Sequence, residues 1–365
     1  MNVIKVLIVD DSLVIRNIIR DALSRASNIE VVGEAQDPLV ARDLIKRLNP
    51  DVITLDIEMP KMDGITFLAN LMRLRPMPVI MLSTLTQKGA DITLQALELG
   101  AIDFIAKPSV EELLSTQDSF QEVLVDKIEQ AVQVDQKNYQ LSNSITKKNT
   151  DDNNSTIEFS GTKRSNHIIA IGASTGGTEA IKNLLLDMPE NSPPIVITQH
   201  IPKNFSLSFA KRLNDLCHLQ VHEASHGQKI KTGHVYIAPG DMHLAVQSKK
   251  GSLFCTLVDS PEVNRHKPAV DVLFDSLSEI AGNVQAVLLT GMGQDGSQAM
   301  LRLKQLGART IIQDKKSSLI WGMPGKAHAL NAHTVELPLK QIASALLSYS
   351  SLDKEGMKGA AHEFI

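Results

Sequence analysis

Cysteine is almost absent from this chain of 365 residues, in which Cys217 and Cys255 are the only two. Two cysteines exclude a disulfide scaffold and fit a reducing compartment, so we expect a cytoplasmic protein. No uninterrupted apolar run reaches the roughly 18 residues needed to span a bilayer. The first residues also lack the basic and then apolar regions of a signal peptide. We therefore expect no direct insertion into a membrane.

An excess of positive charge is also lacking. The net charge is −4, which provides no electrostatic footprint for nucleic acid. The charge is unevenly distributed, with 13 basic and 20 acidic residues in 1–130 and 24 basic and 21 acidic residues beyond. All eleven histidines follow residue 166. A chain of this length is expected to form at least two domains, and this asymmetry predicts that they carry different chemistry.

A polar stretch between residues 134 and 166 separates the two halves. It is rich in Asn, Ser, Thr, Lys and Asp, so it cannot bury enough apolar surface to offset the cost of ordering its backbone. We predict a first domain at 3–122, a linker at 123–165 with a helix at about 120–132, a second domain at 166–350, and a loose tail at 351–365.

The first half alternates short apolar runs with amphipathic segments. The runs have strand length and are rich in Val and Ile: Val3–Val9, Glu30–Gly33, Asp51–Leu55, Pro78–Leu82 and Ile102–Ala106. Five β/α units with continuously apolar strands indicate a parallel sheet that is covered on both faces. Ligands of such sheets bind at the carboxyl ends of the strands.

Polar residues follow four of these runs. Asp10 and Asp11 end the first, Asp56 the third, Ser83 the fourth and Lys107 the fifth. Three carboxylates at one sheet edge repel one another unless a hard cation such as Mg²⁺ neutralises them. A hydroxyl and a lysine at the same edge suit a phosphoryl group. Strand-end Asp residues are often only helix N-caps, but five matching positions favour the functional interpretation.

Over residues 3–122 the sequence resembles the response-regulator receiver family, which has a five-stranded flavodoxin-like fold. The resemblance is carried by LIVDDS (7–12), TLDIEMPKMDG (54–64), MLST (81–84) and AIDFIAKP (101–108). It implies that Asp56 accepts a phosphoryl group from a histidine kinase and that Asp10, Asp11, Asp56 and the carbonyl of Glu58 bind Mg²⁺. It further implies that Ser83 and Lys107 contact the phosphoryl group and that Phe104 is a switch residue. The Lys107–Pro108 bond is a candidate cis peptide.

Three strands of the second half also end in residues with catalytic chemistry. Ser174 follows the predicted strand His167–Ile171 in a Gly-x-Ser-x-Gly turn, His200 follows Pro194–Gln199, and Asp295 follows Val284–Thr290. A serine needs an adjacent base to become a nucleophile, and the base needs an acid to orient it. The order Ser–His–Asp differs from that of the α/β-hydrolases.

Other histidines offer alternatives. His218, His222 and His226 have a four-residue spacing that would align metal ligands on a helix, although Val221–Ala224 has the pattern of a short strand and residues 225–227 that of a turn. His243 is a rival for the base, but it follows a turn rather than a strand of the main sheet.

A second alternative is an NAD-dependent oxidoreductase. Gly291-x-Gly293-x-x-Gly296 matches the dinucleotide-binding pattern between a strand and a helix, and Asp314 follows eighteen residues after Gly296. The pattern comes late in the domain, however, and leaves Ser174 and His200 without a role. A non-enzymatic, phosphorylation-dependent adaptor is a third class, whereas a DNA-binding output is disfavoured because the second half lacks a basic recognition helix.

Residues 166–348 resemble the catalytic domain of the chemotaxis protein-glutamate methylesterases, which is a Rossmann-like α/β domain. The matching blocks are IGASTGG (171–177), ITQHIP (197–202), VYIAPGDMHL (235–244), NRHKPAVDVLF (264–274), LLTGMGQDG (288–296) and QDKKSSLIWGMP (313–324). The resemblance implies a triad of Ser174, His200 and Asp295, with the backbone amides of Thr175 and Met292 at the oxyanion.

The same resemblance implies an activity and partners. It implies a phosphorylation-activated hydrolase that demethylates and deamidates the cytoplasmic part of methyl-accepting chemoreceptors and receives its phosphoryl group from the chemotaxis histidine kinase. Mg²⁺ is expected in the receiver, and no cofactor is expected for the hydrolase. The opposite net charges of the two halves would favour docking of the receiver over Ser174 in the unphosphorylated state.

Overall fold

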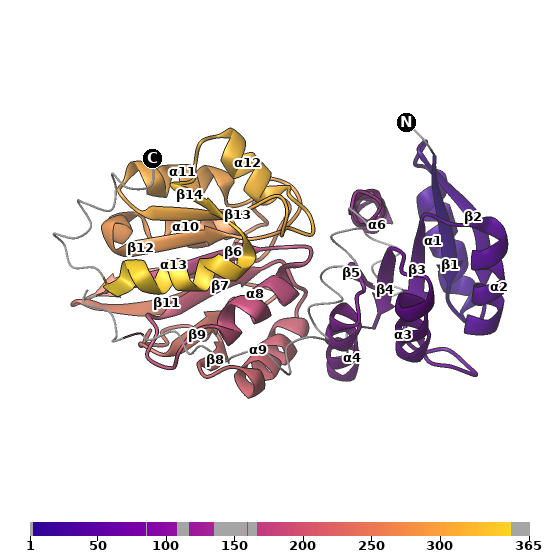
Figure 1. Cartoon of the computed structure of the whole chain (residues 1–365), viewed down its shortest axis with the longest axis horizontal. Coiled ribbons are helices and arrows are strands. Elements are labelled where there is room, and N and C mark those ends of the chain that lie inside the picture. Colours follow the sequence, from indigo (N-terminus) through magenta and orange to yellow (C-terminus); the bar gives the residue numbers. More distant parts are fainter. Residues whose placement is uncertain (1–2, 85, 108–116, 135–158, 160–165, 352–365) are drawn as a thin grey trace. The chain divides into compact units, whose positions relative to one another are not determined.

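The chain divides into two compact units, residues 1–151 and 152–365. The computed structural model describes residues 3–84, 86–107, 117–134, 159 and 166–351 (Figure 1). Most of the predicted linker, the tail beyond Ser351 and Pro108 lie outside these residues. Apart from the helix predicted near residues 120–132, the predictions for the linker, for the tail and for a cis Lys107–Pro108 bond are therefore not addressed by the structure.

The first unit is a five-stranded parallel sheet in the order β2-β1-β3-β4-β5. Its strands are β1 (Ile4–Val9), β2 (Ile29–Ala35), β3 (Val52–Asp56), β4 (Val79–Ser83) and β5 (Asp103–Ala106). Each lies within two residues of the predicted run. Two of the three interior strands, β3 and β4, are buried throughout, as expected for a sheet that is covered on both faces.

Helices connect the strands of the first unit. They are α1 (Leu13–Ser24), α2 (Pro38–Leu48), α3 (Gly64–Leu74) and α4 (Gln87–Glu98), and α6 (Gln117–Ala131) follows the last strand, β5. Helix α6 confirms the helix predicted near residues 120–132. Its residues Leu124, Ile128 and Ala131 are buried, so the helix packs within the first unit, and the proposed domain limit at residue 122 falls inside it.

The second unit contains a seven-stranded parallel sheet in the order β14-β13-β12-β6-β7-β9-β8. The strands are β6 (Ile168–Ala173), β7 (Ile195–Gln199), β8 (Gln220–Glu223), β9 (His234–Ile237), β12 (Val284–Leu288), β13 (Arg309–Gln313) and β14 (Val335–Leu337). The chain progresses from β6 toward β7 on one side and later toward β12 on the other. The switch in direction therefore lies between β6 and β12, where α/β sheets bind ligands.

A two-stranded antiparallel hairpin, β10 (His243–Lys249) with β11 (Ser252–Val258), adds to this sheet domain. No pattern in the sequence indicated this hairpin. Helices α8 (Gly177–Leu186), α9 (Phe205–Leu216), α10 (Val270–Asp275), α11 (Ser297–Gln305), α12 (Met323–Ala329) and α13 (Leu339–Ser351), with the 3₁₀ helix η1 (Ser278–Asn283), complete the unit (Figure 1).

Both units confirm the predicted fold class of two parallel-sheet α/β domains. Apolar residues of the hairpin, of α10 and of the main sheet share one buried cluster in the second unit, which fixes α10 beside the carboxyl ends of β6 and β12. Among the described helices, none is long and apolar enough to cross a membrane.

Candidate functional site

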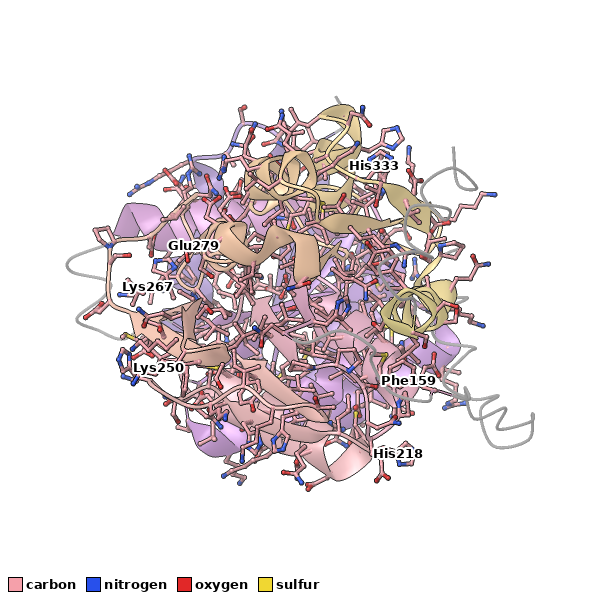
Figure 2. The ribbon with its side chains drawn as sticks, turned by 90° about the vertical axis from the view of Figure 1, so that its left-hand side faces the viewer. Phe159, His218, Lys250, Lys267, Glu279 and His333 are labelled. Carbon is pink, nitrogen blue, oxygen red and sulfur yellow. The ribbon has the colours of Figure 1, made fainter. Side chains whose placement is uncertain are left out.

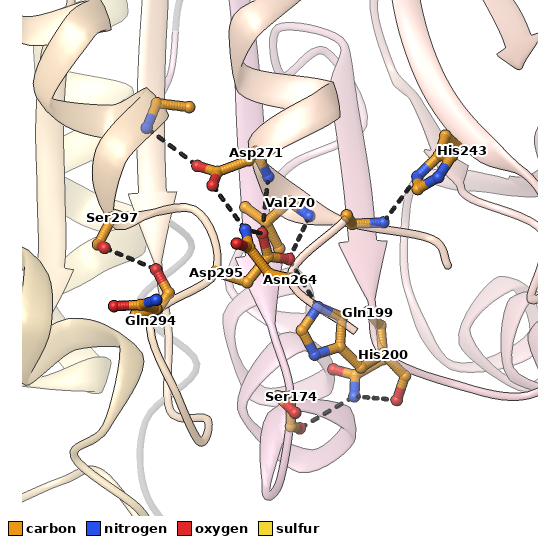
Figure 3. Close-up of polar contacts among 12 residues, drawn as sticks. Ser174, Gln199, His200, His243, Asn264, Val270, Asp271, Gln294, Asp295 and Ser297 are labelled. Atoms are coloured by element: carbon orange, nitrogen blue, oxygen red, sulfur yellow. Dashed lines mark hydrogen bonds and ion pairs between the residues drawn. The ribbon is translucent and has the colours of Figure 1, made fainter. Parts of the chain in front are cut away.

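The buried carboxylate Asp295 and the imidazole of His200 form the centre of a site in the second unit. His200 Nε2 lies 2.8 Å from Asp295 Oδ2, and the Asp295 side chain is 1% exposed. In Figure 3 the His200 ring lies between Asp295 and Ser174. The structure thus brings together Ser174, His200 and Asp295, which follow three different strands in the sequence.

Asp295 accepts four hydrogen bonds. Its Oδ2 accepts from His200 Nε2 and from the backbone N–H of Val270 at 2.6 Å, and its Oδ1 accepts from Asn264 Nδ2 at 2.8 Å and from the N–H of Asp271 at 3.1 Å. Burial acts to raise the pKa of Asp295, but these donors outweigh burial and lower the pKa to about 2. The carboxylate therefore stays charged and holds the histidine in one orientation.

The second ring nitrogen of His200 is the one available to act as a base. His200 Nδ1 is buried and has no hydrogen-bond partner among the described residues. Because Nε2 faces a carboxylate that can only accept, Nε2 carries the proton of the neutral ring and Nδ1 carries the lone pair. No hydrogen bond yet joins Nδ1 to Ser174, as is common in unliganded sites.

The amide of Gln199 links the serine turn to the histidine. Gln199 Nε2 donates to the carbonyls of Ser174 at 2.9 Å and of His200 at 3.2 Å (Figure 3). The turn approaches closely only because residue 177 is a glycine: a Cβ on Gly177 would lie 2.1 Å from Gln199 Oε1. The sequence reasoning did not identify Gln199, although it directly precedes His200.

A second turn packs against Ser174. The N–H of Ser174 donates to the carbonyl of Thr290 at 3.1 Å, and Thr290 Oγ1 donates to the carbonyl of Thr175 at 3.0 Å. The next residue, Gly291, has its carbonyl held by the N–H groups of Gly322 and Met323 at 3.1 and 2.8 Å. The backbone of Thr175 and that of Met292 therefore lie on two turns that are fastened to each other next to the serine.

A cluster of charges lies at the carboxyl end of the first sheet. Carboxylate oxygens of Asp10, Asp11 and Asp56 lie within 4.8 Å of one another. Lys107 Nζ lies 2.8 Å from Asp10 Oδ2 and 2.7 Å from Asp56 Oδ1. Asp10 and Asp56 are buried whereas Asp11 is exposed, so the cluster is open to solvent on one side. Three carboxylates in this arrangement suit a hard cation such as Mg²⁺.

The pKa values of this cluster reflect its crowding. Burial, and then the neighbouring Asp10 carboxylate, raise the pKa of Asp56 to about 6, and Lys107 offsets part of this shift. Burial acts to lower the pKa of Lys107, but its contacts with Asp10 and Asp56 raise it overall. The site therefore holds excess negative charge, which a divalent cation would relieve.

Ser83 and Phe104 point away from solvent. Ser83 is buried, and its Oγ accepts a hydrogen bond from Thr93 Oγ1 at 2.7 Å. Phe104 is also buried, with Lys127 Nζ 5.9 Å from the centre of its ring. In this structure the Ser83 hydroxyl is engaged with α4 rather than directed at the carboxylates.

Two family models match the chain. The model described as CheB methylesterase matches residues 169–346, and that of the response regulator receiver domain matches residues 6–117. The protein-glutamate methylesterase/protein-glutamine glutaminase of Hydrogenovibrio crunogenus is 47% identical over 95% of this chain and 99% of its own. A relative of the same name from Xanthomonas campestris pv. campestris is 49% identical over 95% and 98%.

The chain belongs to the receiver-linked CheB methylesterase family. A solved structure agrees for the second unit: the CheB methylesterase catalytic domain of Thermotoga maritima has a TM-score of 0.50 and 38% identity, and covers 51% of this chain and 100% of its own. The oxidoreductase alternative is not supported by these relatives.

The glycine-rich turn of this CheB methylesterase family member has a different use from dinucleotide binding. A Cβ on Gly291 would lie 2.7 Å from Ser174 Cβ and 2.5 Å from Met323 Sδ, so the glycine permits close contact with the serine turn. Gly296, with φ of +80°, forms the N-cap of α11. These positions explain the spacing without a nucleotide.

The other histidine alternatives also find structural explanations. His243 is buried, its Nδ1 accepts from the N–H of Ala269 at 3.1 Å, and its Nε2 lies 3.0 Å from the carbonyl of Pro261. Both ring nitrogens are thus occupied, and His243 is not available as a base. His222 lies on β8 next to His234, and among the described residues His218, His222 and His226 do not form a group that could hold a metal ion. The predicted short strand and turn around them are confirmed.

Sequence reasoning missed two residues that contact members of the predicted triad. Asn264 bonds Asp295, and the ring of His266 stacks on that of His200 with centroids 3.6 Å apart and planes at 17°. Both belong to the block NRHKPAVDVLF, which carried the resemblance but received no role. The polar residues at the beginning of this block, just before a helix, were the signal that could have indicated a functional role. Only the folded chain, however, brings residues 264–271 next to Asp295.

We expect Gly291→Ala to lower hydrolase activity by about 100-fold, because a shift of the order of 1 Å at a reacting serine can cost that much. The added methyl group would collide with the backbone and side chain of Ser174. Gly282→Ala is the matched control, because nothing lies within 4 Å of the Cβ position there. Steady-state rates of both variants test this, and equal activities would contradict it.

We expect Asp56→Asn to stabilise the first unit at pH 7 in the absence of divalent metal. Because the pKa of Asp56 is raised to about 6 in the folded state, the free energy of unfolding falls as the pH rises from about 4 to 6. At 1.36 kcal/mol per pKa unit, this loss is at most about 3 kcal/mol. The neutral amide avoids this loss. Thermal melts in the presence of a chelator should show that Asp56→Asn raises the melting temperature over that of the wild type by more at pH 7 than at pH 4. An equal rise in melting temperature at both pH values would contradict the prediction.

Proposed function

We propose that Ser174, His200 and Asp295 hydrolyse glutamyl methyl esters of methyl-accepting chemoreceptors and deamidate receptor glutamines. The observation that carries this proposal is the Asp295–His200 pair, which leaves a buried His200 Nδ1 without a partner on the side of Ser174. The names of the relatives support the chemical class, since they are methylesterases and glutaminases that act on protein glutamate and glutamine.

The first half of the reaction forms an acyl-enzyme. Ser174 Oγ attacks the γ-carbonyl carbon of the substrate while His200 Nδ1 takes the hydroxyl proton. The charged imidazolium is stabilised by Asp295, which remains ionised because four donors surround it. Nδ1 then returns the proton to the leaving group, which departs as methanol from an ester or as ammonia from an amide.

The backbone amides of Thr175 and Met292 would hold the oxygen that becomes negative. Their turns are joined through Thr290 and Gly291, so both donors are held beside Ser174 before substrate binds. One oxyanion donor is typically worth about 3 kcal/mol. In the second half of the reaction, water gives a proton to Nδ1 and attacks the acyl carbon. The bond between that carbon and Ser174 Oγ then breaks and Nδ1 returns the proton to Oγ, which releases glutamate and regenerates the hydroxyl.

Phosphorylation of Asp56 would regulate this activity. Asp10, Asp11 and Asp56, with the Glu58 carbonyl, would hold Mg²⁺, and their closely spaced oxygens fit such an ion. Bound Mg²⁺ neutralises charge on the phosphoryl group. Lys107 already contacts Asp56 and would pair with an added phosphoryl oxygen, while Ser83 would exchange its contact with Thr93 for one with the same group. Phe104, on the neighbouring strand β5, would act as the switch residue that changes position when Asp56 is phosphorylated.

We further propose that the receiver restrains the hydrolase until it is phosphorylated by a chemotaxis histidine kinase. The acidic first unit and the slightly basic second part provide opposite charges for docking. The proposed limits are a receiver at 3–122, a linker at 123–165, a catalytic domain at 166–350 and a tail at 351–365. The packing of α6 favours extending the receiver to the end of that helix.

We expect the intact chain to release methanol from methylated receptor and to release it faster when Mg²⁺ and a small-molecule phosphodonor are added. Asp56→Asn should keep the basal rate and lose the increase, whereas Asp51→Asn, an exposed carboxylate on the amino-terminal side of β3, should retain both. Deletion of residues 1–140 should raise the basal rate. No methanol release at all would overturn the activity, and an equal rate after deletion would overturn the restraint.

A further inference from the structure

A group of two histidines and a glutamate lies outside the site described above. His328 is on α12, Glu336 is on β14, and His333 lies in the segment between them. One potential ligand atom from each residue lies within 4.8 Å of those of the other two. His328 Nδ1 lies 2.8 Å from Glu336 Oε2, so the group is already in contact. The proposed hydrolase chemistry uses none of these three side chains.

The two imidazoles face each other. Their centroids are 5.0 Å apart and their planes differ by 15°. Burial, then His328 and Lys304, lower the pKa of His333, which favours the neutral form of this ring. A neutral imidazole is the form that binds a metal ion. His333 Nδ1 is buried without a hydrogen-bond partner among the described residues, which leaves the ring only partly satisfied.

The group is held in place from outside. Lys304 Nζ donates to the carbonyls of Asn331 and His333 at 2.7 and 2.8 Å, which fixes the turn that carries His333. The side chains of His328 and Glu336 are 50% and 31% exposed, so an ion from solvent can reach them. The arrangement therefore combines His333, which is held in place by its backbone, with His328 and Glu336, which are accessible to solvent.

We propose that His328, His333 and Glu336 bind a divalent transition-metal ion, Zn²⁺ in the first instance. Two imidazoles and one carboxylate form a three-ligand zinc set, and a fourth position on the exposed side would be taken by water. The ion would replace the direct contact between His328 and Glu336. The residue types disfavour Mg²⁺ and Ca²⁺, which prefer oxygen ligands.

Metal at this position would join α12 to β14. Helix α12 begins at Met323, whose N–H holds the carbonyl of Gly291. A bound ion would therefore stabilise the folded second unit and stiffen the helix that supports the Gly291 turn. The binding itself does not depend on the proposed hydrolase activity, so it can be measured separately.

The test uses the intact chain, stripped with a chelator and then dialysed, in buffer with excess Mg²⁺ to occupy the receiver carboxylates. Zn²⁺ is titrated by calorimetry, and Co²⁺ is added as a spectroscopic probe of histidine ligation. The variants are His328→Gln and His333→Gln. The control is His218→Gln, because His218 is exposed and lies at a clearly different place on the second unit from His333 (Figure 2).

We expect wild type and His218→Gln to bind one equivalent of Zn²⁺, to melt at a higher temperature with it, and to give a visible Co²⁺ band. Each of the other two substitutions should weaken binding by more than about tenfold, the loss typical of removing even a supporting group of a metal site. His328 is half exposed, so its variant keeps the test valid if His333→Gln unfolds, which circular dichroism would show. No Zn²⁺ binding, or binding unchanged in His328→Gln, would overturn the proposal and leave an ordinary histidine–glutamate ion pair.

Discussion

Ser174→Ala should reduce methanol release by about a millionfold, the loss seen when a triad serine hydrolase loses its nucleophile. Without Oγ, His200 has no hydroxyl to deprotonate and no acyl-enzyme can form. Ser174 lies on a turn fixed by its own backbone, through the N–H to Thr290 and the carbonyl to Gly177 and Gln199. Because these contacts do not involve Oγ, the substitution should leave the fold unchanged.

The matched control for this prediction is Ser344→Ala. Ser344 is exposed on α13, and its hydroxyl bonds only the carbonyl of Gln341 one turn earlier. Its substitution should leave methanol release unchanged. Both variants should show wild-type circular dichroism and melting temperatures. Substantial methanol release by Ser174→Ala would remove the serine from the mechanism, while equal losses in both variants would indicate a general structural defect.

Asp295→Asn should lower kcat by about ten-thousandfold, as expected when the acid that orients a triad histidine becomes an amide. The carboxylate accepts hydrogen bonds on both oxygens, from His200 and the Val270 N–H on one side and from Asn264 and the Asp271 N–H on the other. An asparagine must direct its NH₂ group at one of these two donor pairs. If it faces His200, the ring is driven to the wrong tautomer and Nδ1 is no longer a base.

The same substitution should cost stability, because the NH₂ group would face either the Val270 N–H or the pair formed by Asn264 and the Asp271 N–H, and buried donors would lose their partner. A loss of about 1–3 kcal/mol is expected for each buried unsatisfied group. The exposed Asp215 provides the control substitution Asp215→Asn. Steady-state kinetics at pH 7 and chemical denaturation separate the two effects. A variant with wild-type kcat would show that Asp295 does not orient His200.

Local sequence patterns were sufficient for the elements and for the chemistry at their ends. Runs of Val and Ile between amphipathic segments predicted all five strands of the first unit, because buried parallel strands have no solvent face to interrupt the apolar run. The rule that ligands gather at the carboxyl ends of parallel strands placed Asp10, Asp56 and Lys107 together, and Ser174 near His200 and Asp295. Resemblance to known families added the roles.

Contacts between distant segments were decided only by the tertiary structure. The proposal of Nδ1 as the base follows from which ring nitrogen of His200 meets Asp295, and four donors from two segments, His200 and residues 264–271, hold that carboxylate. The elimination of His243 depends on the carbonyl of Pro261 and the N–H of Ala269, neither of which a local pattern indicates.

The same division explains the unpredicted cluster of His328, His333 and Glu336. Its spacing matches neither a helical nor a strand period, since one residue is on α12, one on the segment that follows it and one on β14. The sequence alone determined the two α/β domains, their strand-end carboxylates and the candidate catalytic residues, because these depend on local periodicity and on the geometry common to parallel sheets. Tertiary packing decided proton positions, supporting residues and the histidine cluster, because these depend on which side chains meet across segments far apart in the chain.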